Sequence, residues 1–411
     1  MRTTVLLLVA FMIASVSCTP VPTRPAAAAA TLTAAPPPPP LATPDTCNYV
    51  RQPTPNPAQP SLFPPVSPQD HVRGPADAYL TVLLYSDFQC PACAKFAALL
   101  ASIQLKYPQE VRIVYRDFPL KSVNDKAVLA DQAAEAASLQ GKFWEMHDLL
   151  FAKQAEWTAL DALKFQAWLV NQAATLGLDT LKFHADLTSP AIAAIPAKAW
   201  QDGLKMQLPG VPLILLNGQI LRSQLTLLSD LESIIRLDLL AKRQFTNCPP
   251  YTIDATKQYQ ATLKTAKGNI VIRLFPDKAP NTVNNFVFLA KAGWYDNISF
   301  YRVVPGFIAQ TGDPSGTGQG NPGYFIPNEL TQAMKFDRPG LVGMNNSGPD
   351  TNGSQFFITS NAIPNLNGTY TLFGQVISGM DVLQKLTARD PKPGDNLPDG
   401  DLLMTVQIEE K

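Results

Sequence analysis

Proline is unevenly distributed along this 411-residue chain, and its distribution limits where folded structure can form. Residues 19–75 contain 17 of the 38 prolines, and alanine and proline runs occur within them. Because proline lacks a backbone N–H and has a fixed φ, such a segment favours extended polyproline II over helices or sheet ladders. We therefore expect residues 19–75 to form a Pro/Ala-rich disordered tether that spaces the folded part from a surface.

Length and charge narrow the class of protein further. A chain of 411 residues allows two or three domains, and 46% apolar residues are enough for hydrophobic cores. The 33 basic residues balance the 33 acidic residues, so the net charge is zero. This balance argues against a nucleic-acid binder held by counterion release and against a polybasic membrane patch.

Residues 1–18 have the pattern of a secretory signal peptide. The apolar run at 5–14 is shorter than the roughly 20 residues that a membrane-spanning helix needs. The small residues before Cys18 resemble a bacterial lipoprotein box, in which that cysteine is lipidated. Ser15 and Ser17 also fit an ordinary cleavage site, which leaves plain secretion as the alternative. We expect an exported protein that is lipid-anchored through Cys18 at the extracytoplasmic face of the membrane.

Two cysteines separate a predicted strand from a predicted helix. Residues 80–85 have the aliphatic and β-branched content of a buried strand, and Cys90-Pro91-Ala92-Cys93 follows after four residues. Pro91 suits the first helical position, which places Cys90 at the N-cap, where the helix dipole lowers the pKa of a thiol. Cys93 is expected to be shielded. This pattern indicates a thiol–disulfide exchange site; zinc ligation and an inert structural disulfide are the alternatives.

Residues 76–245 resemble the DsbA-like branch of the thioredoxin fold, an α/β fold with a helical insertion. The resemblance depends on the two cysteines, on Tyr115-Arg116-Asp117-Phe118-Pro119 and on Gly210-Val211-Pro212. It implies that Val211-Pro212 is a cis peptide bond that faces the cysteines. It also implies that Cys90 exchanges with the substrate disulfide and that Cys93 resolves the mixed disulfide. The direction of the reaction (oxidation, reduction or disulfide isomerisation) stays open.

The insertion and the end of this domain have their own patterns. Residues 126–200 are helical by pattern, Asn217-Gly218 is a type I′ hairpin turn signal, and residues 225–240 form a closing amphipathic helix.

The C-terminal part of the chain has few helices and many short strands, which suggests a closed barrel. Helices are expected at 280–292 and 380–386, and a hairpin at 261–275. The glycine-rich stretch 316–320 is not followed by a helical pattern, so we interpret it as a surface loop and not as a phosphate-binding loop.

Residues 255–411 resemble the cyclophilin family of peptidyl-prolyl isomerases, on the strength of residues 300–313 and 346–358. The resemblance implies an eight-stranded antiparallel barrel capped by two helices. Arg302 matches the family's arginine. A guanidinium that donates to the proline nitrogen of a twisted X–Pro bond would stabilise the transition state more than either planar state.

The same resemblance assigns the residues that bind substrate, and no cofactor or metal is required. Those matching the proline pocket and the groups that bond the substrate backbone are Phe307, Ile308, Gln310, Asn345, Asn346, Gln355, Phe357, Leu366 and Tyr370. The chain departs from the family pattern in several places: Tyr301 and Tyr370 replace histidines, Ile308 replaces a methionine, Asn345 an alanine and Asn365 a tryptophan. We therefore expect activity but weak binding of cyclosporin.

The five cysteines suggest one further disulfide. With Cys18 processed and Cys90 paired with Cys93, Cys47 and Cys248 are left. Because an exported protein favours disulfides, we expect a structural bridge between them that pins the tether to the base of the thioredoxin-like domain. Free or intermolecularly bonded thiols are the alternative.

Together these observations predict an exported folding factor. Its expected parts are the signal (1–18), the tether (19–75), the thioredoxin-like domain (76–245), a connector (246–254) and the cyclophilin-type domain (255–411). The expected partners are unfolded exported polypeptides with X–Pro bonds and cysteines, a membrane redox partner and the lipid bilayer. The competing hypothesis is a non-catalytic chaperone whose CxxC is only structural.

Overall fold

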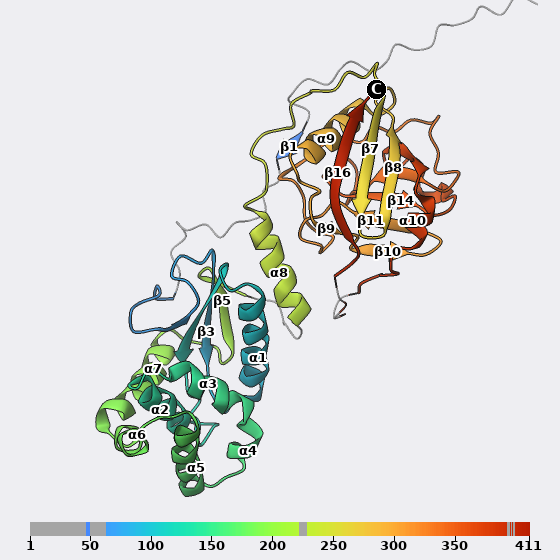
Figure 1. Cartoon of the computed structure of the whole chain (residues 1–411). Helices are drawn as coiled ribbons and strands as arrows, with labels where there is room; N and C mark the ends of the chain where they lie inside the picture. Colours follow the sequence, from blue (N-terminus) through green and yellow to red (C-terminus); the bar gives the residue numbers. More distant parts are fainter. Residues whose placement is uncertain (1–46, 50–62, 222–227, 393–394, 396, 398) are drawn as a thin grey trace, which may run out of the picture. The chain divides into compact units, whose positions relative to one another are not determined.

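A computed structural model describes residues 47–49, 63–221, 228–392, 395, 397 and 399–411 (Figure 1). The predicted signal peptide, Cys18 and most of the predicted tether lie outside these residues. Each of the two folded domains is described by itself below. Among the helices of the described part, none has both the length and the apolar character needed to cross a membrane.

The first domain is built on a five-stranded mixed sheet. Its strand order is β2 (His71–Arg73), β4 (Val111–Asp117), β3 (Leu80–Ser86), β5 (Leu213–Leu216) and β6 (Gln219–Ile220). Strands β3 and β4 run parallel, and the other neighbours are antiparallel. Strand β3 is buried along nearly its whole length, because it lies in the middle of the sheet. The Asn217-Gly218 turn joins β5 to β6 with positive φ at both residues, as the sequence predicts.

Eight helices accompany this sheet within the described residues. They are α1 (Pro91–Lys106), α2 (Ala127–Ser138), α3 (Phe143–Ala152), α4 (Gln154–Thr158), α5 (Ala162–Thr175), α6 (Thr180–Leu187), α7 (Pro190–Lys205) and α8 (Leu228–Leu240). The insertion predicted to be helical therefore comprises α2 to α7. Asp161, Asp179 and Ser189 begin α5, α6 and α7 as N-caps, each accepting a bond from a backbone N–H. This domain confirms the predicted α/β thioredoxin fold with a helical insertion.

The predicted boundary of this domain is wrong, because residues 63–75 belong to the fold and not to the tether. Strand β2 pairs with β4. The Arg116 side chain on β4 donates to the carbonyls of Pro64 and Pro65, at 3.0 and 2.9 Å. Proline keeps its carbonyl acceptor, so a proline-rich segment can be fixed by a guanidinium although it cannot donate to a sheet. Proline content alone therefore misplaced the start of the domain.

The second domain contains one curled antiparallel sheet (Figure 1). In spatial order its strands are β10 (Arg302–Val304), β11 (Ile308–Thr311), β14 (Phe356–Thr359), β13 (Leu341–Met344), β15 (Leu372–Ser378), β8 (Gly268–Leu274), β7 (Tyr259–Thr265), β16 (Leu402–Glu410) and β9 (Ile298–Ser299). The described sheet thus has nine strands where the resemblance implied eight; β9 has only two residues. The two predicted helices are present as α9 (Pro280–Lys291) and α10 (Met380–Gln384), and a 3-10 turn spans Pro364–Leu366. The all-β class is confirmed.

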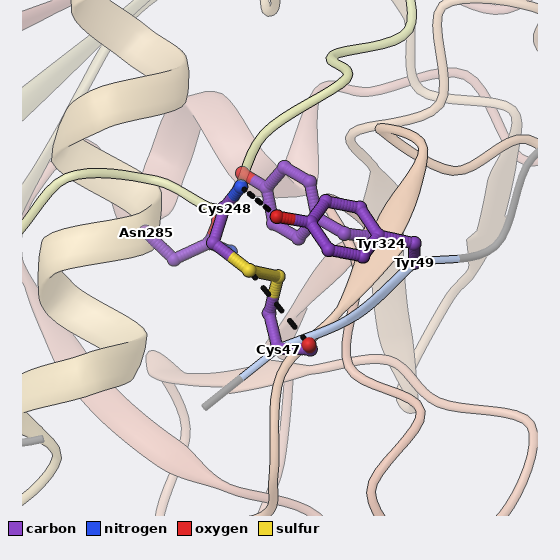
Figure 2. Close-up of a disulfide and its surroundings, with 5 residues drawn as sticks. All are labelled: Cys47, Tyr49, Cys248, Asn285 and Tyr324. Carbon is purple, nitrogen blue, oxygen red and sulfur yellow. Dashed lines mark hydrogen bonds between the residues drawn. A yellow bond between two sulfur atoms is a disulfide. The ribbon is translucent and has the colours of Figure 1, made fainter. Parts of the chain in front are cut away.

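The predicted disulfide between Cys47 and Cys248 is present, with the two Cα atoms 5.9 Å apart (Figure 2). Its place differs from the prediction. Strand β1 (Asn48–Tyr49), directly after Cys47, pairs with β12 (Tyr324–Phe325) of the second domain. The Tyr49 hydroxyl also accepts a bond from the Cys248 backbone N–H at 3.2 Å (Figure 2). The bridge therefore attaches this segment to the second domain, not to the base of the first.

Candidate active sites

The first site forms where strand β3 ends and helix α1 begins. Cys90 is the N-cap of α1 in an extended conformation, and Pro91 occupies the first helical turn. The Cys90 Sγ accepts a bond from the Cys93 backbone N–H at 3.2 Å. An N-terminal N–H that has no helical partner is thus satisfied by the sulfur. The local sequence places this sulfur at the positive end of the helix.

The predicted cis peptide bond Val211-Pro212 is confirmed. It lies beside the first cysteine, because the Cys90 Sγ is 3.9 Å from the Val211 carbonyl oxygen. The residues of the Gly210-Val211-Pro212 motif and the Cys-Pro-Ala-Cys motif, more than a hundred positions apart, therefore meet at one site.

The two cysteines are free thiols in different surroundings. Hydrogen bonding between the Cys93 side chain and Cys90 lowers the pKa of Cys90 to about 7, and bonds from the Cys93 and Ala92 backbone N–H groups act in the same direction. Burial raises the pKa of Cys93, whose exposed fraction is 0% against 9% for Cys90. The site therefore contains one thiol that ionises near neutral pH and one that does not.

Two supporting residues were not identified from the sequence. The buried Asp87 carboxylate accepts bonds from the backbone N–H groups of Gln89 and Leu120, at 2.7 and 2.8 Å, and burial raises its pKa. Gln154 donates from Nε2 to the Cys90 carbonyl at 3.0 Å. Asp87 and Gln154 thus fix the turn before helix α1, which carries Cys90, to residues 120 and 154. Only the position of Asp87, three residues before the first cysteine, offered a sequence signal.

The second site lies on three adjacent strands. Arg302 on β10 is opposite Gln310 on β11, and Gln310 is opposite Phe357 on β14. The Arg302 Nε donates to Asp390 Oδ1 at 2.6 Å, and the side chain is 34% exposed. Its guanidinium carbon is 5.9 Å from the centroid of the Phe307 ring. The register thus places an oriented, solvent-accessible guanidinium beside an apolar surface.

That apolar surface is a compact cluster. The predicted residues Ile308, Phe357 and Leu366 are buried in it, and Phe307 and Tyr370 pack against it from the edge. The cluster also contains Leu341, Leu372, Ile363 and Phe336. None of these four was identified from the sequence, because all of them lie outside both diagnostic motifs.

Glycine is required within β13 beside this cluster. A Cβ on Gly343 would lie 2.5 Å from the Phe357 ring and 2.8 Å from the Phe336 ring. Both rings can therefore approach the sheet only because residue 343 has no side chain.

Gln355 is bonded within the protein on all sides. Its Oε1 accepts from the Tyr301 hydroxyl at 2.5 Å and from Asn345 Nδ2 at 3.1 Å. Its Nε2 donates to the carbonyls of Gly318 and Gly320, at 3.1 and 2.8 Å. In this structure Gln355 therefore fixes the loop at 316–320, whereas the resemblance assigned it to the substrate backbone. Tyr301 and Asn345, two departures from the family pattern, are the residues that orient its amide.

The predicted residues Asn345 and Asn346 lie beside Gln355 and the loop at 316–320. Asn346 donates from Nδ2 to the Thr369 carbonyl at 3.1 Å. A small pocket of about 40 Å³ is lined by Asn345, Asn346, Gln355 and the loop. The loop is held by the buried Asp313 carboxylate, which accepts from the Gly318 and Gly320 backbone N–H groups. It is a loop without a helix directly after it, as predicted.

Within the described residues, no group of three or more histidine, cysteine, aspartate or glutamate side chains is arranged to hold a metal ion.

Comparisons with known proteins match both domains. Residues 260–409 match the family described as cyclophilin type peptidyl-prolyl cis-trans isomerase/CLD, and residues 66–236 match a family described as thioredoxin. The second match also begins before residue 76.

Several curated relatives cover the second domain. A peptidyl-prolyl cis-trans isomerase of Helicobacter pylori is 44% identical over 139 residues, which are 33% of this chain and 85% of that protein. A probable peptidyl-prolyl cis-trans isomerase A of Mycobacterium bovis is 44% identical over 146 residues, 32% of this chain and 80% of that protein. A peptidyl-prolyl cis-trans isomerase-like 2 of Rhizopus delemar is 47% identical over 133 residues, and this chain spans only 25% of its length.

A solved cyclophilin type isomerase of Cryptosporidium parvum is 34% identical, with 37% of this chain and 98% of that chain covered and a TM-score of 0.34.

The chain belongs to the cyclophilin-type peptidyl-prolyl isomerases, and it carries a thioredoxin-like domain ahead of its cyclophilin domain.

Proposed function

We propose that the chain is an exported folding factor that isomerises X–Pro peptide bonds and exchanges thiols with disulfides. The observation that carries the first activity is the Arg302 guanidinium, bonded to Asp390 and placed beside the apolar cluster of Phe307, Ile308 and Phe357. A proline ring in that cluster would present its nitrogen to the guanidinium.

Isomerisation needs no covalent step. The peptide bond has a barrier of about 18–20 kcal/mol because of resonance, and twisting it localises the lone pair on the proline nitrogen. A donor fixed at that nitrogen stabilises the twisted state more than the planar states, which is what lowers a barrier. Asp390 holds Nε, so the terminal N–H groups of Arg302 are already oriented.

The test is an isomerase assay of the full chain on a proline-containing peptide. Arg302→Ala should lower kcat/KM by about 10²–10³-fold, the size expected for losing a donor to a developing charge. Arg338→Ala removes an exposed arginine of the same domain that pairs with Asp337, and it should have no effect. Equal activity of the Arg302 variant and the wild type would disprove the mechanism.

The second proposed activity depends on the thiol pair. The Cys90 thiolate attacks a substrate disulfide, forming a mixed disulfide and releasing one substrate thiolate. Cys93 then loses its proton and attacks the Cys90 sulfur. This forms the Cys90–Cys93 disulfide and releases the second substrate thiolate. The same steps in reverse oxidise a substrate dithiol.

This proposal is supported by the lowered pKa of Cys90 and by its exposed fraction, which is small but larger than that of Cys93. It is tested by following reduction and oxidation of a two-cysteine peptide. Cys93→Ser should stop turnover and accumulate the mixed disulfide on Cys90.

The non-catalytic chaperone remains the competing hypothesis. It predicts suppression of client aggregation that survives in both Arg302→Ala and Cys90→Ser, with no catalysed rate in either assay. A catalysed rate in the wild type that the matching variant loses would reject it.

Export and lipid anchoring are proposed from residues 1–18 alone. Metabolic labelling with a fatty acid tests them: wild type should be labelled, and Cys18→Ala should not. Labelling of neither protein together with release into the medium would favour plain secretion. At the extracytoplasmic face of the membrane, the proposed clients are exported polypeptides, and the proposed redox partner is a membrane protein.

A further inference from the structure

The first domain contains a cavity of about 470 Å³ that neither Cys90 nor Cys93 lines. It is open to solvent on one side and is bordered by residues 64–71, by the ends of β3 and β4, and by helices α2 and α7. Its apolar walls are formed by Pro64, Pro65, Tyr85, Ile195, Ala199 and Met206. A space of this size accommodates a small ligand or a long side chain.

Polar groups without partners line the deep end of this cavity. Asp117 is 9% exposed and Tyr115 is 1% exposed, and both line the cavity. Neither Asp117 Oδ1 nor the Tyr115 hydroxyl has a hydrogen-bond partner within the protein. Buried polar atoms normally have partners, so two such atoms in one cavity indicate a missing donor.

The charges around this deep end are mostly negative. Glu135, which also lines the cavity, raises the pKa of Asp117 and lies 2.8 Å from the His71 ring nitrogen Nε2. Asp131, one turn before Glu135 on α2, is fully buried, and neither of its carboxylate oxygens has a partner. Three carboxyl groups thus lie close together, and only one of them, Glu135, pairs with an imidazole, that of His71.

Two permanent cations line the cavity, and neither balances these carboxyl groups: Lys198 pairs with Asp202, and Arg116 pairs with Asp70. Arg116 donates from Nε and Nη2 to the two oxygens of Asp70, at 2.6 and 2.9 Å. Its Nη1 donates to the Tyr85 hydroxyl at 2.9 Å. The guanidinium is therefore committed to the rim of the cavity, and the deep end keeps its excess of acceptors.

We propose that this cavity binds a guanidinium or ammonium group on an apolar stem, with the charged end bonded to Asp117 and Tyr115. The stem lies against the apolar walls. Both a free small cation and an arginine or lysine side chain of a polypeptide have this chemistry. The inference does not depend on the proposed thiol–disulfide exchange.

The geometry also makes binding dependent on pH. Burial, together with Glu135 and Asp87, raises the pKa of Asp117, so this carboxyl keeps its proton to a higher pH than an exposed carboxyl does. The other charged or titratable groups around it or along the cavity are Asp131 on α2, His71 on β2, Tyr85 on β3, Tyr115 and Arg116 on β4, Asp70, and Lys198 and Asp202 on α7. A cationic ligand binds the carboxylate, so it must displace that proton, and its affinity rises with pH by up to about tenfold per unit.

The test is calorimetric titration of the full chain with N-acetyl-arginine amide and with its neutral isostere N-acetyl-citrulline amide. We expect the arginine compound to bind at least about tenfold more tightly, more so at pH 8 than at pH 6, with release of one proton. Equal binding of the two compounds, or no binding of either at millimolar concentration, would overturn the proposal.

Two variants locate the site. Asp117→Asn keeps the shape of the protonated side chain and should abolish the preference for arginine. Ala199→Phe on α7 fills the cavity from its partly exposed wall and should abolish binding, while Ala199→Ser should not. Undiminished binding to a folded Ala199→Phe protein would place the ligand elsewhere and refute the inference.

A third titration distinguishes the two sources of ligand. If the peptide Gly-Gly-Arg-Gly-Gly binds as tightly as the single amino-acid derivative, the cavity recognises the free cation. If it binds several-fold more tightly, the walls also contact a polypeptide, and the ligand is a basic side chain of a client.

Discussion

Cys90 and Cys93 are three residues apart but should differ in reactivity by orders of magnitude. With a pKa of about 7, Cys90 is half thiolate at neutral pH, whereas burial keeps Cys93 protonated. The rate of alkylation of Cys90 by iodoacetamide should therefore rise between pH 6 and pH 8 and then level off. Peptide mapping after brief labelling of the reduced protein checks this, with Cys90→Ser as the control that leaves Cys93 alone. Faster labelling of Cys93 would reverse the assignment.

Asp390 was not identified from the sequence, yet its carboxylate accepts the hydrogen bond that Arg302 Nε donates. The Arg302–Asp390 pair is partly exposed. Removing the Asp390 carboxylate should therefore loosen the orientation of the Arg302 guanidinium and leave its positive charge in place. We expect Asp390→Asn to lower kcat/KM of isomerisation by about three- to tenfold, far less than Arg302→Ala. Asp337→Asn, which removes the partner of exposed Arg338, is the matched control. A loss as large as that of Arg302→Ala would mean that Asp390 has a direct role.

At the scale of elements, the loop at 316–320 is held by two side chains, the Asp313 carboxylate and the Gln355 amide. Tyr301 replaces the family's histidine and donates to Gln355, whose Nε2 holds Gly318 and Gly320. Tyr301→Phe should therefore speed hydrogen exchange in this loop and lower kcat/KM by up to about tenfold, chiefly through KM. Tyr301→His should restore both, because an imidazole N–H can donate instead.

The control for this prediction is Tyr251→Phe, which removes a hydroxyl with no partner in the protein. It should change neither quantity. If Tyr301→Phe alters exchange in the loop but not turnover, the loop does not contribute to substrate binding.

An element could be predicted from the sequence when its own residues determine its structure, and not when contacts with distant residues do. The strand, the cysteine pair and the helix after it were predictable, because Pro91 and the apolar pattern act locally. Strand β2 was missed, because what fixes its segment is the Arg116 side chain of another strand. Phe336 was missed for a similar reason, since its contact with Phe357 is made across the fold.

At the scale of the whole molecule, the disulfide was predictable from cysteine parity, but its place was not. Cys47 and Cys248 flank the first domain in sequence, which suggested an attachment there. The pairing of β1 with β12 and the Tyr49 hydroxyl decide otherwise (Figure 2). Backbone pairing of a two-residue strand leaves almost no trace in a sequence.

The bridge joins cysteines 201 positions apart, so it constrains the unfolded chain over about half its length. Loop-closure models give such a bridge about 4–5 kcal/mol, and real bridges often deliver less. We expect the double variant Cys47→Ser/Cys248→Ser to unfold at a lower denaturant concentration, by an amount equal to about 2–4 kcal/mol. Urea unfolding of the full chain, followed by fluorescence, measures the change. Wild type treated with reductant should shift in the same direction, and the double variant should then respond to reductant only through the Cys90–Cys93 pair. Cys90→Ser/Cys93→Ser, which lacks the other pair, should keep its response. An unchanged unfolding curve for Cys47→Ser/Cys248→Ser would contradict the prediction, because it would mean that the bridge does not change the free energy of unfolding.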